Sequence, residues 1–512
     1  MKKIKLASML AVLVFMLTAC SQSNNTETYI SQSLQYALDM AILRRENIAA
    51  PDSTAILYLI QRQEQLPAAR NRLPFRYPPT IARDYFPVED AITDIWLLLD
   101  LMRDRYGGYT YFGGDEVFIP LFEALEAELL GHGCNVIGEI LGLGGDVITL
   151  EAFSEIVLLR LSSAVLDTHF AINNRPMYVV YEFYHYTGAT YDRSAAGFRN
   201  RDTGLYLVEI EGHNIDDTMM LHLDFYGNLF YTPVVFVDRH SLLTDDFIYK
   251  LHTHPYPQEF IDEQLHKAPI YFIYEGGKQE RRQFESYSMN ILDGWVDDYF
   301  VDLSLPTLEF IDGIPVVNVM IMGHSLLRDT YDLHVAPFLS FAELLQNEPV
   351  VIIDLRGNQG GSSAVVSRWL YYLTGRRVPR NFVALPARGY TPSQVNTGPR
   401  EIVEIDQKLV VLTDRWTSSA GEVFVDAAFS MTNTLVIGVP TRGMLVASGA
   451  HPDSGYSLPN TGLPFGFGST LYVWPEGHFA EGVGILPDIW VDGDALTAAL
   501  VLLRNSGFGE SD

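Results

Sequence analysis

Apolar residues recur every three or four positions in several parts of the chain, which is the spacing of one helix face. In 91–106, for example, Ile92, Ile95 and Leu99 follow this spacing. The same period predicts further helices at 29–69, with a polar connection at 51–54, and at 117–130, 156–165 and 338–345. We therefore expect a helical region at 34–174, ahead of the rest of the fold.

A different pattern begins near residue 175. Alternating and aromatic-rich runs at 177–181, 204–210 and 229–237 are separated by Gly, Asn and Asp, which predicts strands joined by turns. We interpret 175–312 as a mostly β insert.

The last two hundred residues contain mostly apolar runs, at 315–322, 349–353 and 409–413. Such short runs bounded by polar and glycine residues are typical of buried strands. Helical segments lie between and after them, and strands alternating with helices indicate an α/β core. We assign the chain to the α/β (α+β) class, with its core at 313–512.

Two of these strands end in segments that carry candidate chemistry. The first ends in Asp354-Leu355-Arg356-Gly357-Asn358-Gln359-Gly360-Gly361, and the second in Asp414-Arg415-Trp416-Thr417-Ser418-Ser419-Ala420-Gly421-Glu422, followed by a helix. Unpaired amides at such turns and at a helix N-terminus can stabilise an anion beside a hydroxyl nucleophile. The alternative is a structural helix cap made of small residues.

A third segment, Glu481-Gly482-Val483-Gly484-Ile485-Leu486-Pro487-Asp488-Ile489, completes an ordered set of motifs. Together the three resemble the serine peptidase family of C-terminal processing (tail-specific) proteases and the tricorn protease core. The resemblance implies a crotonase/ClpP-like catalytic core and a serine peptidase acting on polypeptides. It also places a peptide-binding module of relatives where the β insert lies. We find no carboxylate-binding loop there, so we interpret the insert as a degenerate or replaced substrate-selecting module.

The resemblance assigns site residues by position. Ser419 matches the nucleophile, and Ser418 is the second candidate. The amides of Ala420 and of Gly360 and Gly361 match the oxyanion hole. His169, in Leu166-Asp167-Thr168-His169, matches the general base of tricorn-like relatives, and His324 competes with it.

Tail-specific relatives use a lysine as the base, but Met444 stands at that position and no lysine follows Lys408. Arg442 cannot replace it because a guanidinium does not lose its proton in this pH range. The resemblance therefore favours a Ser-His-Glu site with Glu481 as the orienting carboxylate. Glu422 is the rival, and its position also suits a capping-box acid for Ser419.

Composition and net charge exclude some classes of binding partner. The 512 residues are 48% hydrophobic and carry a formal net charge of −28, which argues against nucleic acid and anionic membrane surfaces as partners. His252 and His254 could bind metal from a strand, but without a clear third ligand we interpret them as surface histidines. We expect no cofactor and no metal.

The N-terminus predicts a lipoprotein signal. A basic start, an apolar stretch at 6–16 and Leu17-Thr18-Ala19-Cys20 precede a polar spacer. We expect a signal peptide at 1–19, lipidation of Cys20, a tether at 20–33 and a protein anchored on the extracytoplasmic face of the bacterial membrane. The chain has 2 Cys, so lipidation of Cys20 leaves Cys134 without an intrachain partner.

Two functions from different classes follow. The first is an anchored serine endopeptidase that acts through an acyl-enzyme. The alternative is a peptide-binding lipoprotein with a decayed catalytic site, suggested by the missing lysine and the unfamiliar insert.

Overall fold

A computed structural model describes residues 26–66, 84–132, 146–173, 175–177, 181–185, 191–194, 197–201, 206–210, 219–224, 226–238, 270–275, 278–283, 287–289, 304–323, 331–387, 402–448, 456–479, 481–491 and 493–509. The predicted signal peptide, Cys20, Cys134, His252, His254 and His324 lie outside these residues. Among the described residues, no helix has the length and apolar character needed to cross a membrane.

The predicted helices are present, with differences at their ends, and the structure adds helices at 331–335, 363–374 and 495–505 that were not predicted individually. They are α2 (Thr26–Glu46), α3 (Ser53–Gln65), α4 (Val88–Arg105), α5 (Asp115–His132), α7 (Leu150–Ser162), the π-helix η2 (Tyr331–Val335), α11 (Ala336–Leu344), α12 (Ser363–Thr374), α13 (Ala420–Ala428) and α14 (Ala495–Asn505).

The core sheet holds the three predicted apolar runs as neighbouring strands, at 314–318, 350–354 and 408–413, together with three other described strands that lie outside those runs. The six strands are β14 (Thr307–Ile311), β15 (Ile314–Asn318), β16 (Val350–Asp354), β18 (Lys408–Thr413), β19 (Thr434–Gly438) and β23 (Ile489–Trp490). Strands β15 to β23 run parallel in the order β15-β16-β18-β19-β23, and β14 adds an antiparallel edge. Since parallel strands point the same way, the turns after β16 and β18 meet at one edge of the sheet.

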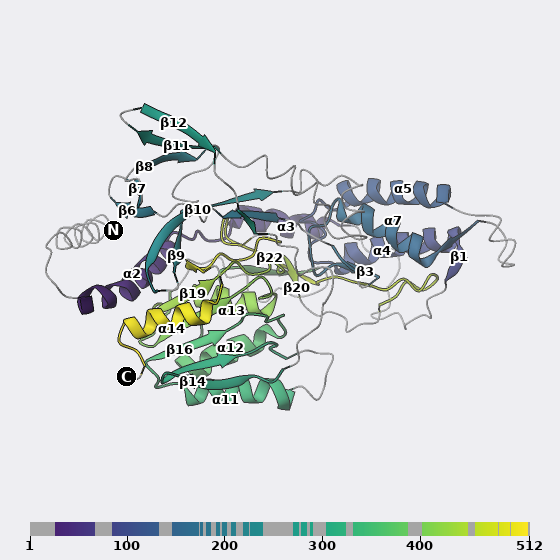
Figure 1. The fold of residues 1–512 in the computed structure, drawn as a ribbon. Coiled ribbons are helices and arrows are strands. Elements are labelled where there is room, and N and C mark those ends of the chain that lie inside the picture. Colours follow the sequence, from purple (N-terminus) through teal and green to yellow (C-terminus); the bar gives the residue numbers. More distant parts are fainter. Residues whose placement is uncertain are drawn as a thin grey trace.

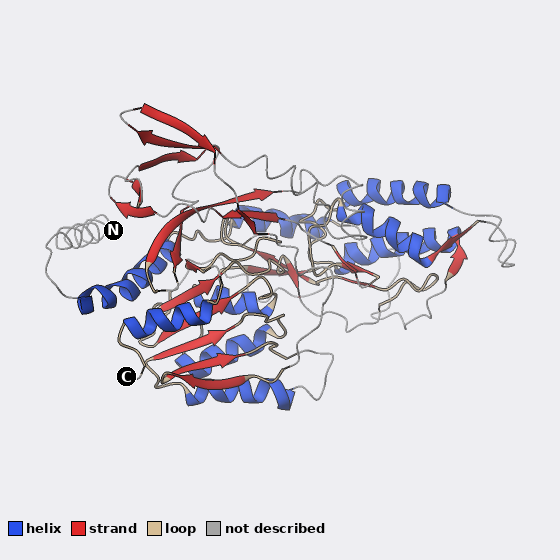
Figure 2. Ribbon diagram, viewed as in Figure 1, coloured by secondary structure: helices blue, strands red, loops and turns tan. Residues whose placement is uncertain are grey.

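Both faces of this sheet are covered by helices (Figures 1 and 2). Ile352 and Val410 belong to a core shared with α14 and α2, whereas their neighbours Ile353 and Val411 belong to a core shared with α11, α12 and α13. Successive strand residues point to opposite faces, so two buried faces require the uninterrupted apolar runs seen in the sequence. The mixed α/β class predicted from the sequence is confirmed.

The helical region lies beside the core, with α4, α5 and α7 packed together (Figure 1). A short pair, β1 (Tyr85–Pro87) and β2 (Val147–Thr149), joins the start of α4 to the start of α7. One hydrophobic cluster contains Phe122 and Phe153 from these helices together with Leu458 and Leu471 from the C-terminal part of the chain. The helical region and the core are therefore packed against each other.

The segment predicted as a β insert is made of strands where it is described. Besides β14, they are β4 (Arg175–Pro176), β5 (Tyr181–His185), β6 (Tyr191–Ser194), β7 (Gly197–Asn200), β8 (Tyr206–Ile210), β9 (Met219–Leu223), β10 (Leu229–Asp238), β11 (Ile270–Glu275), β12 (Lys278–Gln283) and β13 (Tyr287–Met289). Strand β3 (Ala171–Ile172) lies just before the insert and pairs with β4. Strand β9 pairs in parallel with β23, so several of these strands continue the core sheet. The domain limits given above remain predictions.

Small sheets connect the C-terminal loops to the rest. They contain β17 (Val383–Pro386), β20 (Ala447–Ser448), β21 (Phe465–Gly466) and β22 (Thr470–Val473). Strand β21 pairs with β3, which directly follows the predicted catalytic histidine. The N-terminal helix α2 is also bound to the core, because the fully buried guanidinium of Arg45 donates to Asp488 at 2.6 Å and to the carbonyl oxygen of Thr434 at 2.7 Å.

Candidate active site

Ser419 lies at a sharp bend between strand β18 and helix α13. Its backbone has φ 51° and ψ −113°, a conformation that a residue with a side chain rarely adopts. The bend, which we call the elbow (414–422), is held by Asp414, whose carboxylate accepts the amides of Trp416 and Thr417 at 2.9 Å. Strained strand-to-helix bends of this kind present a nucleophile at the edge of a sheet.

The turn after β16, which we call the glycine turn (355–361), packs directly against the elbow. Asn358 accepts the Ser418 amide through its carbonyl oxygen at 2.8 Å and donates its side-chain NH₂ to the carbonyl oxygen of Val319 at 2.7 Å. At Gly360, where φ is +103°, an added Cβ would lie 2.7 Å from the Ser419 Cβ. Glycine is therefore required at this position, both by the backbone angle and by the space.

Burial separates the two candidate nucleophiles. Ser418 is 1% exposed, and its Oγ has no hydrogen-bond partner among the described residues. Ser419 is partly exposed, and its Oγ lies 3.3 Å from the Nε2 atom of His169. Of the two, only Ser419 combines access with a base.

The amides assigned to the oxyanion hole differ in their availability. The Gly360 amide donates to Asn358 Oδ1 at 2.9 Å, so in this structure it is engaged within the glycine turn. In the described part of the chain, the amides of Gly361 and Ala420 have no hydrogen-bond acceptor. Ala420 begins α13, whose N-terminus adds positive potential beside Ser419. Gly361 and Ala420 are thus the better candidates.

His169 is brought to the elbow from far along the chain. It follows α7 in a turn, and the next strand, β3, pairs with β21 of the C-terminal region. The side chain is 5% exposed and meets Ser419, a residue 250 positions away. The sequence prediction that pairs these two residues corresponds to a direct contact here.

Glu481 is hydrogen-bonded to the residue that precedes His169. It is 8% exposed, and its Oε1 accepts the Thr168 amide at 2.9 Å and the Thr168 hydroxyl. Its Oε2 accepts the amides of Leu445 at 3.0 Å and Val446 at 2.8 Å. The carboxylate therefore holds the residue before His169.

Glu422 lies on the other side of the site and is fully buried. Its Oε2 accepts the amide of Ser419 at 3.0 Å, which is the backbone contact expected of a capping-box acid. It also accepts three further hydrogen bonds, from the Thr441 hydroxyl and the amides of Gly443 and Met444. Glu422 thus orders both the elbow and the loop after β19.

One short segment, 443–446, connects the two carboxylates. Its first two amides donate to Glu422 and its next two donate to Glu481. Met444, which occupies the position of the missing lysine, contributes only its backbone amide to this arrangement. The nucleophile and the base are therefore positioned against the same stretch of backbone.

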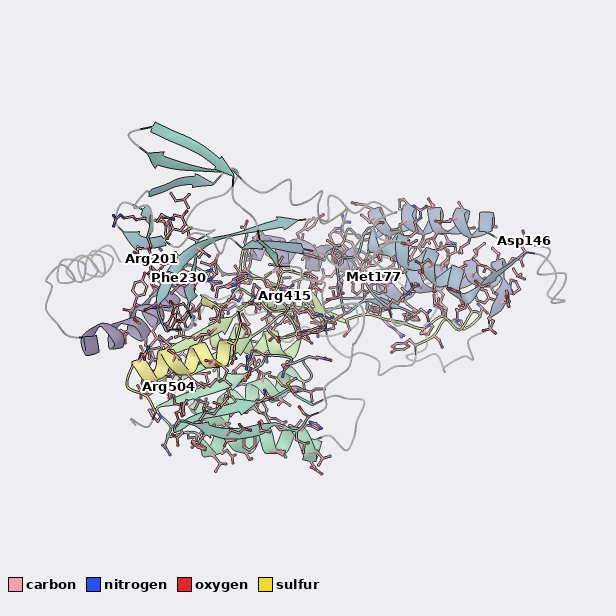
Figure 3. The ribbon with its side chains drawn as sticks, viewed as in Figure 1. Asp146, Met177, Arg201, Phe230, Arg415 and Arg504 are labelled. Atoms are coloured by element: carbon pink, nitrogen blue, oxygen red, sulfur yellow. The ribbon has the colours of Figure 1, made fainter. Side chains whose placement is uncertain are left out.

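A half-buried arginine contributes to this end of the site. Arg415, labelled near the middle of the molecule in Figure 3, donates to the carbonyl oxygens of Val483 at 2.8 Å and Gly482 at 2.9 Å. Burial lowers its pKa to about 10. These bonds fix the turn that carries Glu481 against the elbow that carries Ser419.

Burial also raises the pKa of three carboxylic acids around the site. It raises the pKa of Glu422, although four hydrogen bonds oppose the shift. It raises the pKa of Asp167 to about 7, and burial together with the neighbouring charge of Asp167 raises the pKa of Glu481 well above its ordinary value. The charge of Asp167 opposes ionisation of Glu481, so the two acids resist carrying two negative charges at once.

Several residues of the site were not assigned a role from the sequence. Thr168, Asn358 and Thr441 each bridge two segments by hydrogen bonds. The polar run Asp167-Thr168-His169 after an apolar helix was the available signal for Thr168. Among the described residues, no group of three or more His, Cys, Asp and Glu is placed to hold a metal ion.

A family match now agrees with the geometry. Residues 335–491 match the model of peptidase family S41. The match covers the glycine turn, the elbow and the segment that carries Glu481, and it confirms the predicted resemblance and the enzyme class, a serine peptidase. His169 lies outside the matched residues.

Solved structures show distant likeness over most of the chain. Mature CPAF complexed with lactacystin has 14% identity and a TM-score of 0.40, covering 82% of this chain and 96% of its own. The photosystem II D1 C-terminal processing protease has 13% identity and a TM-score of 0.34, and the match covers 79% of this chain and 93% of that protein. The tricorn protease has 14% identity and a TM-score of 0.34, and the match covers 81% of this chain and 37% of that protein. No curated protein matches the chain.

Proposed function

We propose that this chain is a membrane-anchored, extracytoplasmic serine endopeptidase that hydrolyses peptide bonds through Ser419, His169 and Glu481. The observation that carries the proposal is the 3.3 Å separation between Ser419 Oγ and His169 Nε2. A hydroxyl needs a base in hydrogen-bond reach to become a nucleophile at neutral pH. The contact supplies that base at a bend whose strained backbone exposes the hydroxyl.

The first step is acylation. His169 Nε2 accepts the proton of Ser419 Oγ as the oxygen attacks the carbonyl carbon of the substrate. The amides of Ala420 and Gly361 donate to the oxygen that becomes negative. When the tetrahedral intermediate collapses, the C–N bond breaks and His169 returns the proton to the leaving amine.

The second step is deacylation. Water attacks the ester on Ser419, His169 accepts one of its protons, and the acid product leaves as the Ser419 hydroxyl forms again. Because 3.3 Å is at the long end of a hydrogen bond, we expect the Oγ to Nε2 distance to shorten when substrate binds.

Glu481 acts on the base through the neighbouring residue, Thr168. It holds the amide and the hydroxyl of Thr168, and so fixes the backbone from which His169 projects. Glu422 performs the matching role for Ser419 by accepting its amide.

A fluorophosphonate probe tests the proposal because it reacts with activated serine hydroxyls. We expect it to label the folded wild type and Ser418→Ala but not Ser419→Ala, with hydrolysis of a peptide library lost in parallel. His169→Gln should lower the labelling rate by on the order of 10⁴-fold, because the proton acceptor is lost. Ser418→Ala is the matched control, since its hydroxyl is buried without a hydrogen-bond partner among the described residues.

Absence of label from folded wild-type protein would refute the enzyme and would favour the alternative, a peptide-binding lipoprotein with a decayed site.

A second experiment tests whether the protein is anchored to the membrane through Cys20. Cys20→Ala should move the protein from the membrane fraction to the soluble fraction and abolish incorporation of labelled fatty acid. Continued membrane retention of Cys20→Ala would contradict lipid anchoring without affecting the assignment of the site.

A further inference from the structure

A turn rich in aromatic residues and glycine, at 106–115, links the helical region to the histidine. Tyr106 ends α4 and is 1% exposed. The Gly107 amide donates to the carbonyl oxygen of Gly468 at 2.9 Å, and an added Cβ at Gly107 would lie 2.6 Å from the Leu471 amide nitrogen. The turn is therefore docked closely on the C-terminal part of the chain.

This docking directs the Tyr106 hydroxyl at an acid beside the base. The hydroxyl donates to Asp167 Oδ2 at 2.8 Å, and Asp167 Oδ1 accepts the amide of His169 at 2.9 Å. Asp167 is fully buried. A continuous chain of hydrogen bonds thus runs from the end of α4 to the backbone of the candidate base.

Two acids hold consecutive amides in this segment. Glu481 accepts the amide of Thr168, and Asp167 accepts the amide of His169. The first acid comes from the C-terminal turn, whereas the second depends on a hydroxyl from the helical region. The backbone that precedes the imidazole is therefore held from two directions.

We propose that Tyr106 and Asp167 are positioning residues that set the distance between the His169 imidazole and the Ser419 hydroxyl. The inference rests on the proposed function, because it assigns a role relative to the same base and nucleophile. Hydrogen bonds to an ionised acid are stronger and shorter than neutral ones, so the Tyr106 bond makes Asp167 a more rigid acceptor. A small displacement of a catalytic group lowers the rate disproportionately.

The pair also predicts a signature in the pH dependence. The titratable groups that face Asp167 are Tyr106 at the end of α4 and Glu481 in the C-terminal turn, and Tyr111 and Glu481 also act on Tyr106. The hydrogen bond from Tyr106 lowers the pKa of Asp167, partly offsetting the effect of burial. Without that hydroxyl, Asp167 should ionise at higher pH.

The chain offers a matched control for the hydroxyl. Tyr109 lies in the same turn, is also 1% exposed, and donates its hydroxyl to Asp115 at 2.7 Å, compared with 2.8 Å for Tyr106 and Asp167. Asp115 begins α5 and accepts from Arg103, so this second pair belongs to the helical region alone. Tyr106→Phe and Tyr109→Phe each remove one buried hydroxyl that donates to a carboxylate.

The experiment measures fluorophosphonate labelling rates from pH 5 to 9 on full-length variants, with urea unfolding as the measure of stability. We expect both variants to lose similar stability, but only Tyr106→Phe to label about tenfold more slowly and to shift its pH profile upward. Asp167→Asn should remove the step due to Asp167 from the profile while keeping an acceptor for the His169 amide. Labelling in all three variants must still depend on Ser419.

Equal rates and identical profiles for Tyr106→Phe and Tyr109→Phe would overturn the inference. In that case, Ser419-dependent labelling of the wild type would leave the proposed function in place. Should Tyr106→Phe fold poorly, an unchanged profile in Asp167→Asn would overturn the inference equally. A wild type that is not labelled would refute both the function and the inference.

Discussion

The nucleophile and the base of the site are each held in place by a buried acid, but the two acids come from different parts of the chain. The nucleophile side consists of the elbow and the glycine turn, and its buried acid is Glu422. The base side consists of 167–169 and its supports, and its buried acid is Glu481. Each acid accepts four hydrogen bonds, and each takes two of them from 443–446.

The two acids differ in their sequence separation from the residue that they hold. Glu422 is three residues from Ser419, so the first turn of α13 brings them together. Glu481 is 313 residues from Thr168, and only the complete fold joins them. The base side also contains a second buried acid, Asp167. The nucleophile is thus held locally, whereas the base depends on contacts between the helical region and the core.

The largest effect should come from the glycine turn. In Gly360→Ala, the new Cβ would lie 2.7 Å from the Ser419 Cβ and 3.0 Å from the Ala420 nitrogen, at a φ of +103°. We expect the labelling rate to fall by at least on the order of a hundredfold, because both the nucleophile and an oxyanion donor must move. Unfolding free energy should fall by about 2–4 kcal/mol, as measured by urea unfolding.

Gly375→Ala is the control for Gly360→Ala. Gly375 also has a positive φ, +68°, but an added Cβ there would meet nothing within 4 Å. It should cost about 1 kcal/mol of stability and leave the labelling rate unchanged. If Gly360→Ala also left the rate unchanged, the close packing of the glycine turn on the elbow would have no catalytic importance.

Replacing each buried acid by glutamine compares the two sides directly. Glutamine keeps the size but places an NH₂ donor against groups that already donate, so each variant should lose about 1–3 kcal/mol for every amide left without an acceptor. We expect Glu422→Gln to lower the labelling rate more than Glu481→Gln, roughly a hundredfold against tenfold. Glu422 holds the reacting residue itself, whereas Glu481 holds the neighbour of the base.

The exposed Glu343 on α11 provides the control, as Glu343→Gln should change neither rate nor stability. A larger loss of rate in Glu481→Gln than in Glu422→Gln would contradict this ranking. It would indicate that Thr168 transmits more of the effect of Glu481 to His169 than a backbone contact explains.

The last prediction concerns stability as a function of pH, not the labelling rate. Burial raises the pKa of Asp167 from 3.8 to about 7, so its contribution to stability is fully present below about pH 4 and is lost as the pH rises through about 7. We expect the unfolding free energy of the wild type to decrease over this range by on the order of a few kcal/mol. Asp167→Asn should make the decrease smaller, as measured by urea unfolding at fixed pH values.

The nucleophile side serves as the internal reference for this measurement. A variant of Glu422 should leave the Asp167 part of the pH dependence unchanged, because the two acids hold different segments. An equal slope in wild type and Asp167→Asn would contradict the assignment of this transition to the base side.

Most of the fold could be predicted because it depends on local pattern. The uninterrupted run at 349–353 predicts β16, since a strand covered on both faces needs apolar residues in succession. The period in 91–106 predicts α4 in the same way. The link between β9 and β23 was not predicted, because strand partners from distant parts of a chain leave no periodic signal.

By itself, the sequence determined the elements, the α/β class and the nucleophile side, whose glycine and small-residue turns are local consequences of backbone sterics. Only the tertiary structure decided which acid contacts what: Glu481 binds Thr168, and Tyr106 binds Asp167. It also showed that the Gly360 amide is already bound to Asn358. The physical reason is that hydrogen bonds between distant segments depend on how those segments pack, which residue types and spacing do not encode.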